Sequence, residues 1–267
     1  MLYVVGIGPG GLDMMTFEAR RAIEESDIVV GYKTYTHLMK ELIKDKTVIK
    51  TGMCKEIERC TTALELAQEG KTVSIISSGD AGVYGMAGLI LEMVTRQKWD
   101  VEVKVIPGMT ASIAAASVLG APLMHDFCHI SLSDLLTPWE VIEQRVKSAA
   151  EADFVVCFYN PRSRGREGHL KRAFELMAPF VDGKTPVGIV KEAGRRKEEK
   201  WLTTFEEMDF ELVDMRTLVI VGNKSTYIEN GLMVTPRGYE VARDDAADES
   251  APVEETTTDA ELAGEAQ

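Results

Sequence analysis

Two loops rich in glycine and small hydroxyl residues carry most of the information about the fold of this chain. Residues 77–85 (SSGDAGVYG) follow the β-branched run 73–76, and residues 107–112 (PGMTAS) follow the run 101–106. Each loop leads directly into a segment with helical character. In open α/β sheets, ligands bind at the carboxyl ends of parallel strands. The two loops therefore predict a parallel sheet with a ligand site where its strands end.

The first half of the chain alternates strand-like and helix-like segments. Apolar, β-branched runs predict strands at 2–7, 27–31, 48–50, 72–76 and 101–106. Apolar residues at helical spacing predict helices at 16–25, 35–43, 57–69, 85–96 and 110–119. This alternation is typical of a parallel sheet of about five strands covered by helices.

The second half continues the α/β pattern after a hinge at 121–126. Strand-like runs lie at 128–132, 154–159, 186–191 and 217–222, and helix-like segments at 139–149 and 167–180. Residues 201–207 fit a strand followed by a short helix. We therefore expect an α/β protein of two α/β domains, residues 1–120 and 121–241, with a ligand cleft between them.

Much of the negative charge lies at the end of the chain. The formal net charge is −13, but residues 244–267 hold nine acids and no Lys or Arg, so residues 1–243 carry only −4. The tail at 242–267 has almost nothing to bury, which predicts a disordered acidic segment that the chemistry does not need. Basic clusters elsewhere are short and lack interleaved aromatic residues, so we expect no nucleic-acid partner.

Three features predict a cytoplasmic protein with no membrane partner. Residues 2–5 have the character of a strand and not of a secretory leader. The four cysteines contain no Cys-x-x-Cys pair, which is typical of reduced thiols in the cytoplasm. The stretch 105–125 has no charged side chain, but proline and glycine interrupt it, so a buried helix explains it better than a membrane span.

The glycine-rich loop at 6–11 (GIGPGG) formally matches the G-x-G-x-x-G pattern of dinucleotide sites. The acid expected at the end of the following strand is missing, since Asp27 stands at the beginning of that strand. Pro9 also removes an N–H group that a pyrophosphate would use. The loop therefore fits either a tight strand-to-helix turn or a ligand loop, and it favours NAD only weakly.

Asp80 fits two roles. Its side chain can accept hydrogen bonds from nearby backbone N–H groups in a turn. It can also face a ligand, where a carboxylate suits ribose hydroxyls or a cationic group. Its place beside Thr110 at the ends of neighbouring strands favours the second role.

Basic and titratable residues mark the second half. Two clusters follow its strands: Arg162, Arg164 and Arg166, then Arg195, Arg196 and Lys197. Guanidinium groups pair with carboxylates in bidentate geometry, so a polycarboxylate or phosphate substrate fits them, as does an ordinary solvated face. The run 125–129 (HDFCH) could serve in acid–base chemistry or in the structure, and without a second ligand cluster we expect no metal held by the protein.

Three motifs together resemble the tetrapyrrole methylase family, whose members use S-adenosylmethionine and have two α/β domains around a cleft. The motifs are VGIGPG at 5–10, SGDAGVYG at 78–85 and PGMTA at 107–111. The resemblance covers residues 1–239. Within the family, residues 125–139, 159–164 and 219–226 resemble the precorrin-3B or cobalt-precorrin-3 C(17)-methyltransferases.

The resemblance implies methyl transfer in the corrin branch of porphyrin biosynthesis, which leads to cobalamin, together with contraction of the macrocycle. The residues that it implies for the methyl donor are Pro9, Gly79, Asp80, Val83, Tyr84, Thr110 and Ala111, with Tyr159 and Ala193 from the second domain. Ala81 stands where many relatives have proline, which removes no functional group.

Two further sets of residues follow from this chemistry. Ring contraction needs proton transfers, for which we expect Asp126, His129 or Asp134. The carboxylates of the macrocycle suit the cationic residues Arg162, Arg164, Arg195 and Lys224. Any cobalt would arrive inside the substrate.

Other functions stay open at this point. The chain could methylate another corrin position, act as an NAD-dependent oxidoreductase, or carry a tetrapyrrole without catalysis. The resemblance also implies a homodimer.

Overall fold

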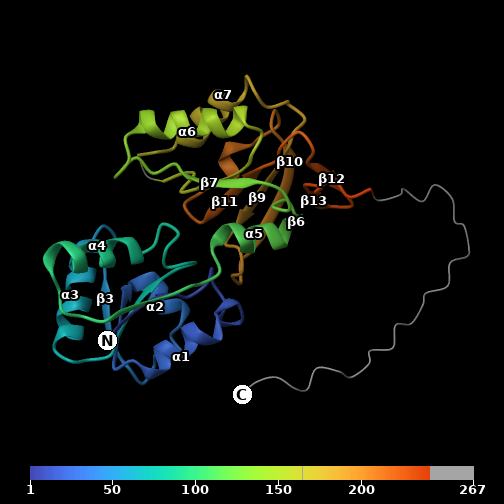
Figure 1. Cartoon of the computed structure of the whole chain (residues 1–267). Coiled ribbons are helices and arrows are strands. Elements are labelled where there is room, and N and C mark those ends of the chain that lie inside the picture. Colours follow the sequence, from blue (N-terminus) through green and yellow to red (C-terminus); the bar gives the residue numbers. More distant parts are fainter. Residues whose placement is uncertain (164, 241–267) are drawn as a thin grey trace, which may run out of the picture. The chain divides into compact units, whose positions relative to one another are not determined.

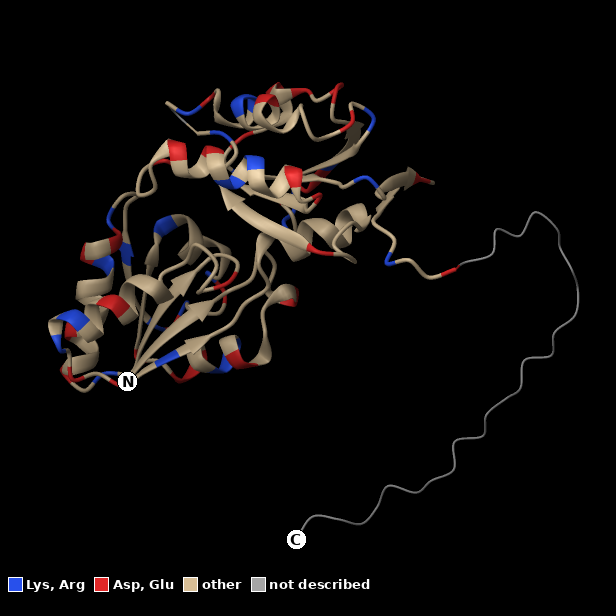
Figure 2. Cartoon of the chain, turned by 45° about the horizontal axis from the view of Figure 1, so that its top comes forward, with Lys and Arg blue, Asp and Glu red and all other residues tan. Residues whose placement is uncertain are grey.

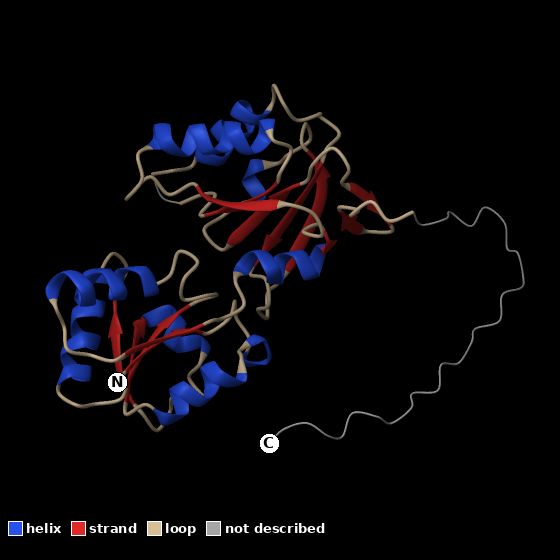
Figure 3. Cartoon of the chain, in the orientation of Figure 1, coloured by secondary structure: helices blue, strands red, loops and turns tan. Residues whose placement is uncertain are grey.

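The computed structural model describes residues 1–163 and 165–240 of the chain (Figure 1). Met1–Arg237 form one compact unit. Its described residues form two five-stranded sheets, both flanked by helices, and a three-stranded sheet (Figure 3). The predictions for Arg164 and for the acidic tail at 242–267 fall outside the described residues. None of the described helices has the length and apolar character that a bilayer span requires.

The first sheet is parallel throughout, as predicted. Its strands are β1 (Leu2–Gly6), β2 (Ile28–Tyr32), β3 (Thr47–Thr51), β4 (Val73–Ser77) and β5 (Val103–Ile106), in the order β3-β2-β4-β1-β5. A parallel sheet buries both of its faces, which explains why β1, β2 and β4 are nearly continuous apolar runs. The loops that follow β4, β1 and β5 therefore leave the sheet side by side at one edge.

Helices cover both faces of this sheet and bury a separate apolar cluster on each. Helices α1 (Phe17–Glu25) and α2 (Lys33–Leu38) pack on one face, and α3 (Glu56–Gln68) and α4 (Ala87–Gln97) pack on the other. Thr16 caps α1, because its hydroxyl accepts a hydrogen bond from the N–H of Ala19 at 3.0 Å. The helix predicted at 35–43 ends earlier, at Leu38, and the chain continues as turns.

The second sheet is mixed. Its strands are β7 (Phe127–Ser131), β8 (Val155–Tyr159), β9 (Pro186–Lys191), β10 (Glu199–Thr204) and β11 (Thr217–Val221), in the order β10-β9-β11-β8-β7. Strands β7 and β8 are parallel, and every other pair is antiparallel. Helices α6 (Trp139–Glu151) and α7 (His169–Met177) cover one face. Residues 201–207 form the end of β10 and a turn, so the short helix expected there was wrong.

Helix α5 (Ala111–Leu119) links the two sheets. It follows the last strand of the first sheet but packs on the free face of the second, against β8, β9 and β11 (Figure 1). Gly188 on β9 permits the close approach, since a Cβ atom there would lie 2.4 Å from Leu119 Cδ1. The division into domains 1–120 and 121–241 stays a prediction.

A small sheet that the sequence did not reveal lies beyond α5. It consists of β6 (Gly120–Ala121), β12 (Tyr227–Glu229) and β13 (Leu232–Val234). Met233 on β13 is fully buried in the same apolar cluster as α5. These strands are too short for an apolar period to be visible in the sequence.

Candidate active site

A cavity of about 590 Å³ lies at the carboxyl edge of the first sheet. Its wall combines loops that follow strands of the first sheet with the ends of β8, β9 and β11 from the second. Nine of its lining residues are those expected to hold the methyl donor: Pro9, Gly79, Asp80, Val83, Tyr84, Thr110, Ala111, Tyr159 and Ala193. The structure thus groups residues that are far apart in the sequence around one space.

Glycines bring three strand ends into direct backbone contact beside the cavity. Gly8 and Gly79 exchange two backbone hydrogen bonds, at 3.0 and 2.8 Å. A Cβ atom on Gly108 would lie 2.2 Å from the carbonyl oxygen of Gly79, and one on Gly6 would lie 2.7 Å from the nitrogen of Gly108. No side chain larger than hydrogen fits at Gly6 or Gly108, whereas Gly79 is favoured by its φ of 71°.

The carboxylate of Asp80 fixes the loop between β4 and α4. Its Oδ1 atom accepts hydrogen bonds from the N–H groups of Gly82 at 2.7 Å and Val83 at 3.0 Å. Its Oδ2 atom accepts one from the N–H of Gly108 at 2.9 Å, which ties this loop to the loop after β5. A carboxylate has about four acceptor sites, so one remains for a ligand. Asp80 therefore takes the turn role, and its place in the cavity wall leaves the ligand role open as well.

Tyr159, at the end of β8, connects the second sheet to the cavity loops of the first half. Its hydroxyl lies 2.6 Å from Thr110 Oγ1 and accepts a hydrogen bond from the N–H of Ser112 at 3.0 Å. Either hydroxyl can be the donor in the bond between Tyr159 and Thr110. These bonds hold the start of α5 against the wall of the cavity.

An aromatic group surrounds Tyr159. The ring of Tyr84 lies 5.1 Å from the ring of Tyr159, and the ring of His129 lies 5.2 Å from it on β7. The Tyr84 hydroxyl donates to the carbonyl oxygen of His129 at 3.2 Å. Tyr84 adopts a φ of 55°, a left-handed conformation that is rare for an aromatic residue and typical of functional loops.

His129 also contacts the buried Ser112. Its Nε2 atom lies 2.8 Å from Ser112 Oγ. Burial lowers the pKa of His129 below its usual value, so the imidazole is neutral at neutral pH. His129 does not line the cavity itself. It contacts Tyr159, which does, and Ser112, which follows the lining residue Ala111.

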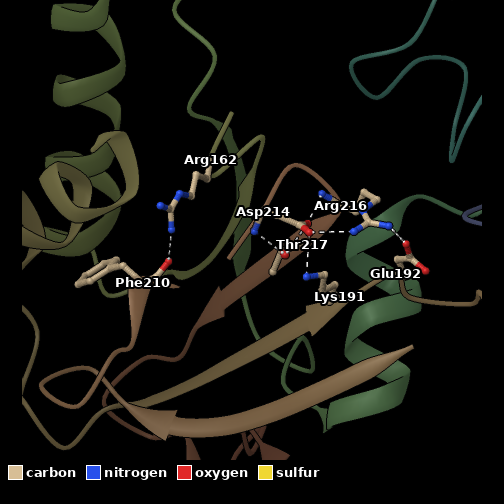
Figure 4. Close-up of polar contacts among 7 residues, drawn as sticks. All are labelled: Arg162, Lys191, Glu192, Phe210, Asp214, Arg216 and Thr217. Carbon is tan, nitrogen blue, oxygen red and sulfur yellow. Dashed lines mark hydrogen bonds and ion pairs between the residues drawn. The ribbon is translucent and has the colours of Figure 1, made fainter. Parts of the chain in front are cut away.

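A charged network that the sequence did not reveal contributes Glu192, Asp214 and Arg216 to the cavity lining (Figure 4). Asp214 accepts from Lys191 at 2.8 Å and from Arg216 at 3.1 Å, and Arg216 also pairs with Glu192. Burial would raise the pKa of Asp214, but hydrogen bonds from Lys191 and Arg216 outweigh it and lower the pKa to about 2. The antiparallel pairing of Thr217 with Lys191 is what brings these two segments together.

The predicted substrate-binding cations that the structure describes, Arg162, Arg195 and Lys224, do not gather in the cavity. Arg195 lines it, but its guanidinium is engaged, donating to the carbonyl oxygen of Pro9 at 2.8 Å and to Ser78 Oγ at 3.4 Å. Arg162 donates to the carbonyl oxygen of Phe210 and to Glu211, both at 3.1 Å (Figure 4). Both hydrogen bonds of Arg195 go through Nε and Nη2, so within the described residues its Nη1 group stays available to a ligand.

Lys224 lies at the wrong end of its strand for a role in the cavity. It follows the carboxyl end of β11, whereas the cavity touches the amino end, at Thr217 and Leu218. Its backbone N–H donates to Asp153 at 3.1 Å. The antiparallel direction of β11 is the reason, because it reverses which end of the strand faces the cavity.

The three expected acid–base residues are spread along β7 and the loop after it. Asp126 precedes β7 and is exposed, with His125 Nδ1 at 3.5 Å. Since Ser131, at the other end of β7, pairs with Tyr159, Asp126 is about 16 Å farther along the strand from the cavity edge. Asp134 lies beyond β7, 3.8 Å from Arg166 and 3.6 Å from His169. Of the three, the structure brings His129 alone into contact with a residue of the cavity wall.

Comparisons with known proteins agree on one family. Residues 1–209 match the family model described as Tetrapyrrole (Corrin/Porphyrin) Methylases. The chain is 72% identical over 239 residues to a probable cobalt-factor III C(17)-methyltransferase from Salmonella typhimurium, which covers 90% of this chain and 99% of that protein. It is 40% identical over 246 residues to a precorrin-3B C(17)-methyltransferase from a Sinorhizobium species, with 89% and 96% covered.

Solved structures give the same result. The crystal structure of the methyltransferase CobJ superposes with a TM-score of 0.83 at 36% sequence identity. The match covers 88% of this chain and 99% of CobJ.

Proposed function

Because the chain belongs to the tetrapyrrole (corrin/porphyrin) methylase family, we propose that it is a methyltransferase of cobalamin biosynthesis that methylates C(17) of its macrocyclic substrate. The observation that carries the proposal is the 72% identity to a probable cobalt-factor III C(17)-methyltransferase over nearly its whole length. The lower identity of 40% to a precorrin-3B enzyme favours cobalt-factor III as the substrate. The cobalt ion then enters as part of the substrate.

We propose S-adenosylmethionine as the methyl donor. When bound, it supplies a methyl group already activated by the sulfonium. The cavity suits such a ligand, because Gly79 in its wall presents bare backbone that a flat group can approach closely. Asp80 has an acceptor site left for a ribose hydroxyl, and Tyr84 and Tyr159 offer aromatic faces.

The part of the protein in this transfer is to bind, orient and shield. Orientation alone can contribute about 7–11 kcal/mol to a reaction between two bound groups. Tyr159 fixes the start of α5 through Thr110 and Ser112, and Asp80 fixes the neighbouring loop, so the donor would meet a preorganised wall. The transfer needs no nucleophilic side chain, and none of the described residues that line the cavity is a cysteine, histidine or lysine.

For the proton transfers of ring contraction, we propose His129 in preference to Asp126 and Asp134. Its contacts to Ser112 and to the ring of Tyr159 place it nearest to the cavity of the three. Burial lowers its pKa, so the neutral imidazole is available as a base at neutral pH. The rate of contraction should therefore rise with pH through a pKa below about 6.5.

The variant His129→Gln tests this role. Glutamine can keep a hydrogen bond to Ser112 but cannot titrate, so we expect the acid limb of the kcat–pH profile to disappear while S-adenosylhomocysteine binds normally. An unchanged profile in the variant would assign the proton transfers to another group. His125→Gln, which alters the exposed imidazole before β7, serves as the control and should keep the wild-type profile.

Titration calorimetry with S-adenosylhomocysteine and, separately, with NAD tests the proposed function. We expect micromolar binding of the first and none of the second. Binding of NAD alone would favour an oxidoreductase. Binding of a tetrapyrrole without any donor would favour a carrier.

We also propose a cytoplasmic location and a homodimer. The location rests on the four cysteines, all of which lie in the described residues and are free thiols. The homodimer rests on the family resemblance, and light scattering on the purified protein measures it directly.

A further inference from the structure

A second hollow, of about 590 Å³, lies between helix α2 and the edge strand β3. We name it the lysine groove after its rim, which carries Lys33, Lys40, Lys44, Lys46, Lys50 and His37. Its floor is uncharged and largely buried, with Thr36, Ile43 and Val48. None of the described residues that line it is Asp or Glu.

Most of these ammonium groups are available. Lys33, Lys44 and Lys50 are exposed and make no side-chain hydrogen bond or ion pair within the described residues. Lys46 differs, because its Nζ donates to the carbonyl oxygens of Glu24 and Ser26 and so holds the end of α1. On several other helices, basic and acidic residues are interspersed (Figure 2). The groove therefore gathers positive charge on a body whose net charge is negative.

The groove adjoins the candidate active site. Thr34 lines both the groove and the active-site cavity, and Tyr32 and Tyr35 line the cavity on either side of it. Gly31 pairs with Lys50 at the ends of β2 and β3, so the groove reaches the same carboxyl edge of the sheet as the cavity. A ligand that fills the cavity can extend into the groove past Thr34.

Of the cations expected for the substrate, those that the structure describes offer few partners to its carboxylates. Arg195 is bonded to Pro9 and Ser78, Arg162 to Phe210 and Glu211, and Lys224 lies at the far end of β11. A tetrapyrrole of the corrin branch carries several carboxylates on flexible aliphatic arms. An apolar floor with ammonium groups on its rim matches such arms in both charge and polarity.

We propose that the lysine groove binds peripheral carboxylates of the tetrapyrrole substrate while its ring lies beside the methyl donor at the active-site cavity. The inference rests on the proposed function and adds to it a specificity subsite on α2 and β3. Lysine suits this task because its ammonium is a point charge on a flexible stem, which can follow carboxylates at varied positions. Exposed ion pairs are individually weak, so the subsite works through several lysines together.

The double variant Lys44→Glu/Lys50→Glu tests the proposal. Steady-state methyl transfer to cobalt-factor III should show a KM for the tetrapyrrole raised about 10-fold, with kcat and the KM for S-adenosylmethionine within about 2-fold of wild type. The wild-type KM should also rise with salt more steeply than that of the variant, because screening acts on the charges removed. The matched control Lys147→Glu/Lys171→Glu changes the net charge equally on α6 and α7, and it should keep the wild-type KM.

Each outcome has a separate meaning. An unchanged KM for cobalt-factor III in the groove variant overturns the proposal, as does an equal rise in the control, which would reflect net charge alone. Calorimetry with S-adenosylhomocysteine accompanies every variant and reports whether the cavity is intact. If the wild-type protein neither binds S-adenosylhomocysteine nor transfers methyl, the proposed function fails first, and it does so independently of the groove.

Discussion

Asp80→Asn is the substitution whose effect follows most directly from the geometry. Asparagine keeps an oxygen for the N–H groups of Gly82 and Val83, but it places an NH₂ group where Oδ2 accepts from the N–H of Gly108 at 2.9 Å. Two donors then face each other. If the amide turns over, the bond to Gly108 is restored and the two bonds in the loop are lost instead.

The magnitude follows from the loss of one charge-assisted hydrogen bond and the N–H left without an acceptor. Such a loss costs about 1.5–3 kcal/mol, so we expect the free energy of unfolding to fall by about 2 kcal/mol. For a chain of this size that corresponds to a fall in Tm of about 4–8 °C. Because Gly108 precedes Thr110 and Ala111 in the cavity wall, we also expect S-adenosylhomocysteine to bind at least about 10-fold more weakly.

Urea unfolding and calorimetry measure the two quantities on the same preparation. Asp182→Asn is the matched control, because Asp182 Oδ1 accepts one hydrogen bond from the N–H of Lys184 in an exposed turn and asparagine retains that oxygen. The control should change stability by less than about 0.5 kcal/mol. Wild-type stability and wild-type affinity in Asp80→Asn would refute the assignment of Asp80 as the residue that joins the two loops.

Two further predictions concern packing and pH. Gly108→Ala places a Cβ atom 2.2 Å from the carbonyl oxygen of Gly79, so urea unfolding should show a free energy of unfolding lower by about 3 kcal/mol. The control Gly88→Ala, in open space on α4, should be neutral or stabilising. Equal stabilities of the two variants would contradict the close packing at Gly108. Asp214 has a pKa of about 2 when folded against about 3.9 when unfolded, so its contribution is present above pH 4 and is lost as the pH falls toward 2. Discounted for partial exposure, the contribution of Asp214 to the free energy of unfolding is about 1 kcal/mol. In Asp214→Asn, the free energy of unfolding should therefore fall by about 1 kcal/mol less than in wild type as the pH drops from 4 to 2. The same pH dependence in both proteins would show that the network with Lys191 does not stabilise the fold.

The first sheet could be predicted from the sequence because each of its strands, and the helix that follows it, leaves a pattern in a short stretch of the chain. Nearly continuous apolar runs such as 73–76 identify buried parallel strands, and the helix that follows each run fixes the direction of the connection. Parallel direction then places every loop after a strand at one edge. This is why Gly79, Asp80 and Thr110 could be grouped before the structure was known, and they do line one cavity.

The second sheet was harder to predict because its strands alternate in direction. In an antiparallel pair, the cavity meets the carboxyl end of one strand and the amino end of its neighbour. Lys191 at the end of β9 and Asp214 before β11 therefore face each other, although nothing in either segment alone shows it. The same geometry puts Lys224, which the expected substrate chemistry had placed in the cleft, at the other end of β11.

Helix α5 shows a different limit. Its alanine-rich sequence predicts a tightly packed helix, and Ala115 and Leu119 are fully buried. The spacing of apolar residues within α5 does not indicate which of the two sheets the helix covers. That choice depends on Gly188, 69 positions after Leu119, where the absence of a side chain admits the helix.

Transfer of an isotopically labelled methyl group from S-adenosylmethionine to cobalt-factor III tests the central claim most directly. The purified chain is incubated with both compounds, and nuclear magnetic resonance locates the label in the product. We predict that the label appears at C(17), with one equivalent of S-adenosylhomocysteine released for each methyl transferred. A label at another carbon, or an unlabelled macrocycle in the presence of bound donor, would contradict the account.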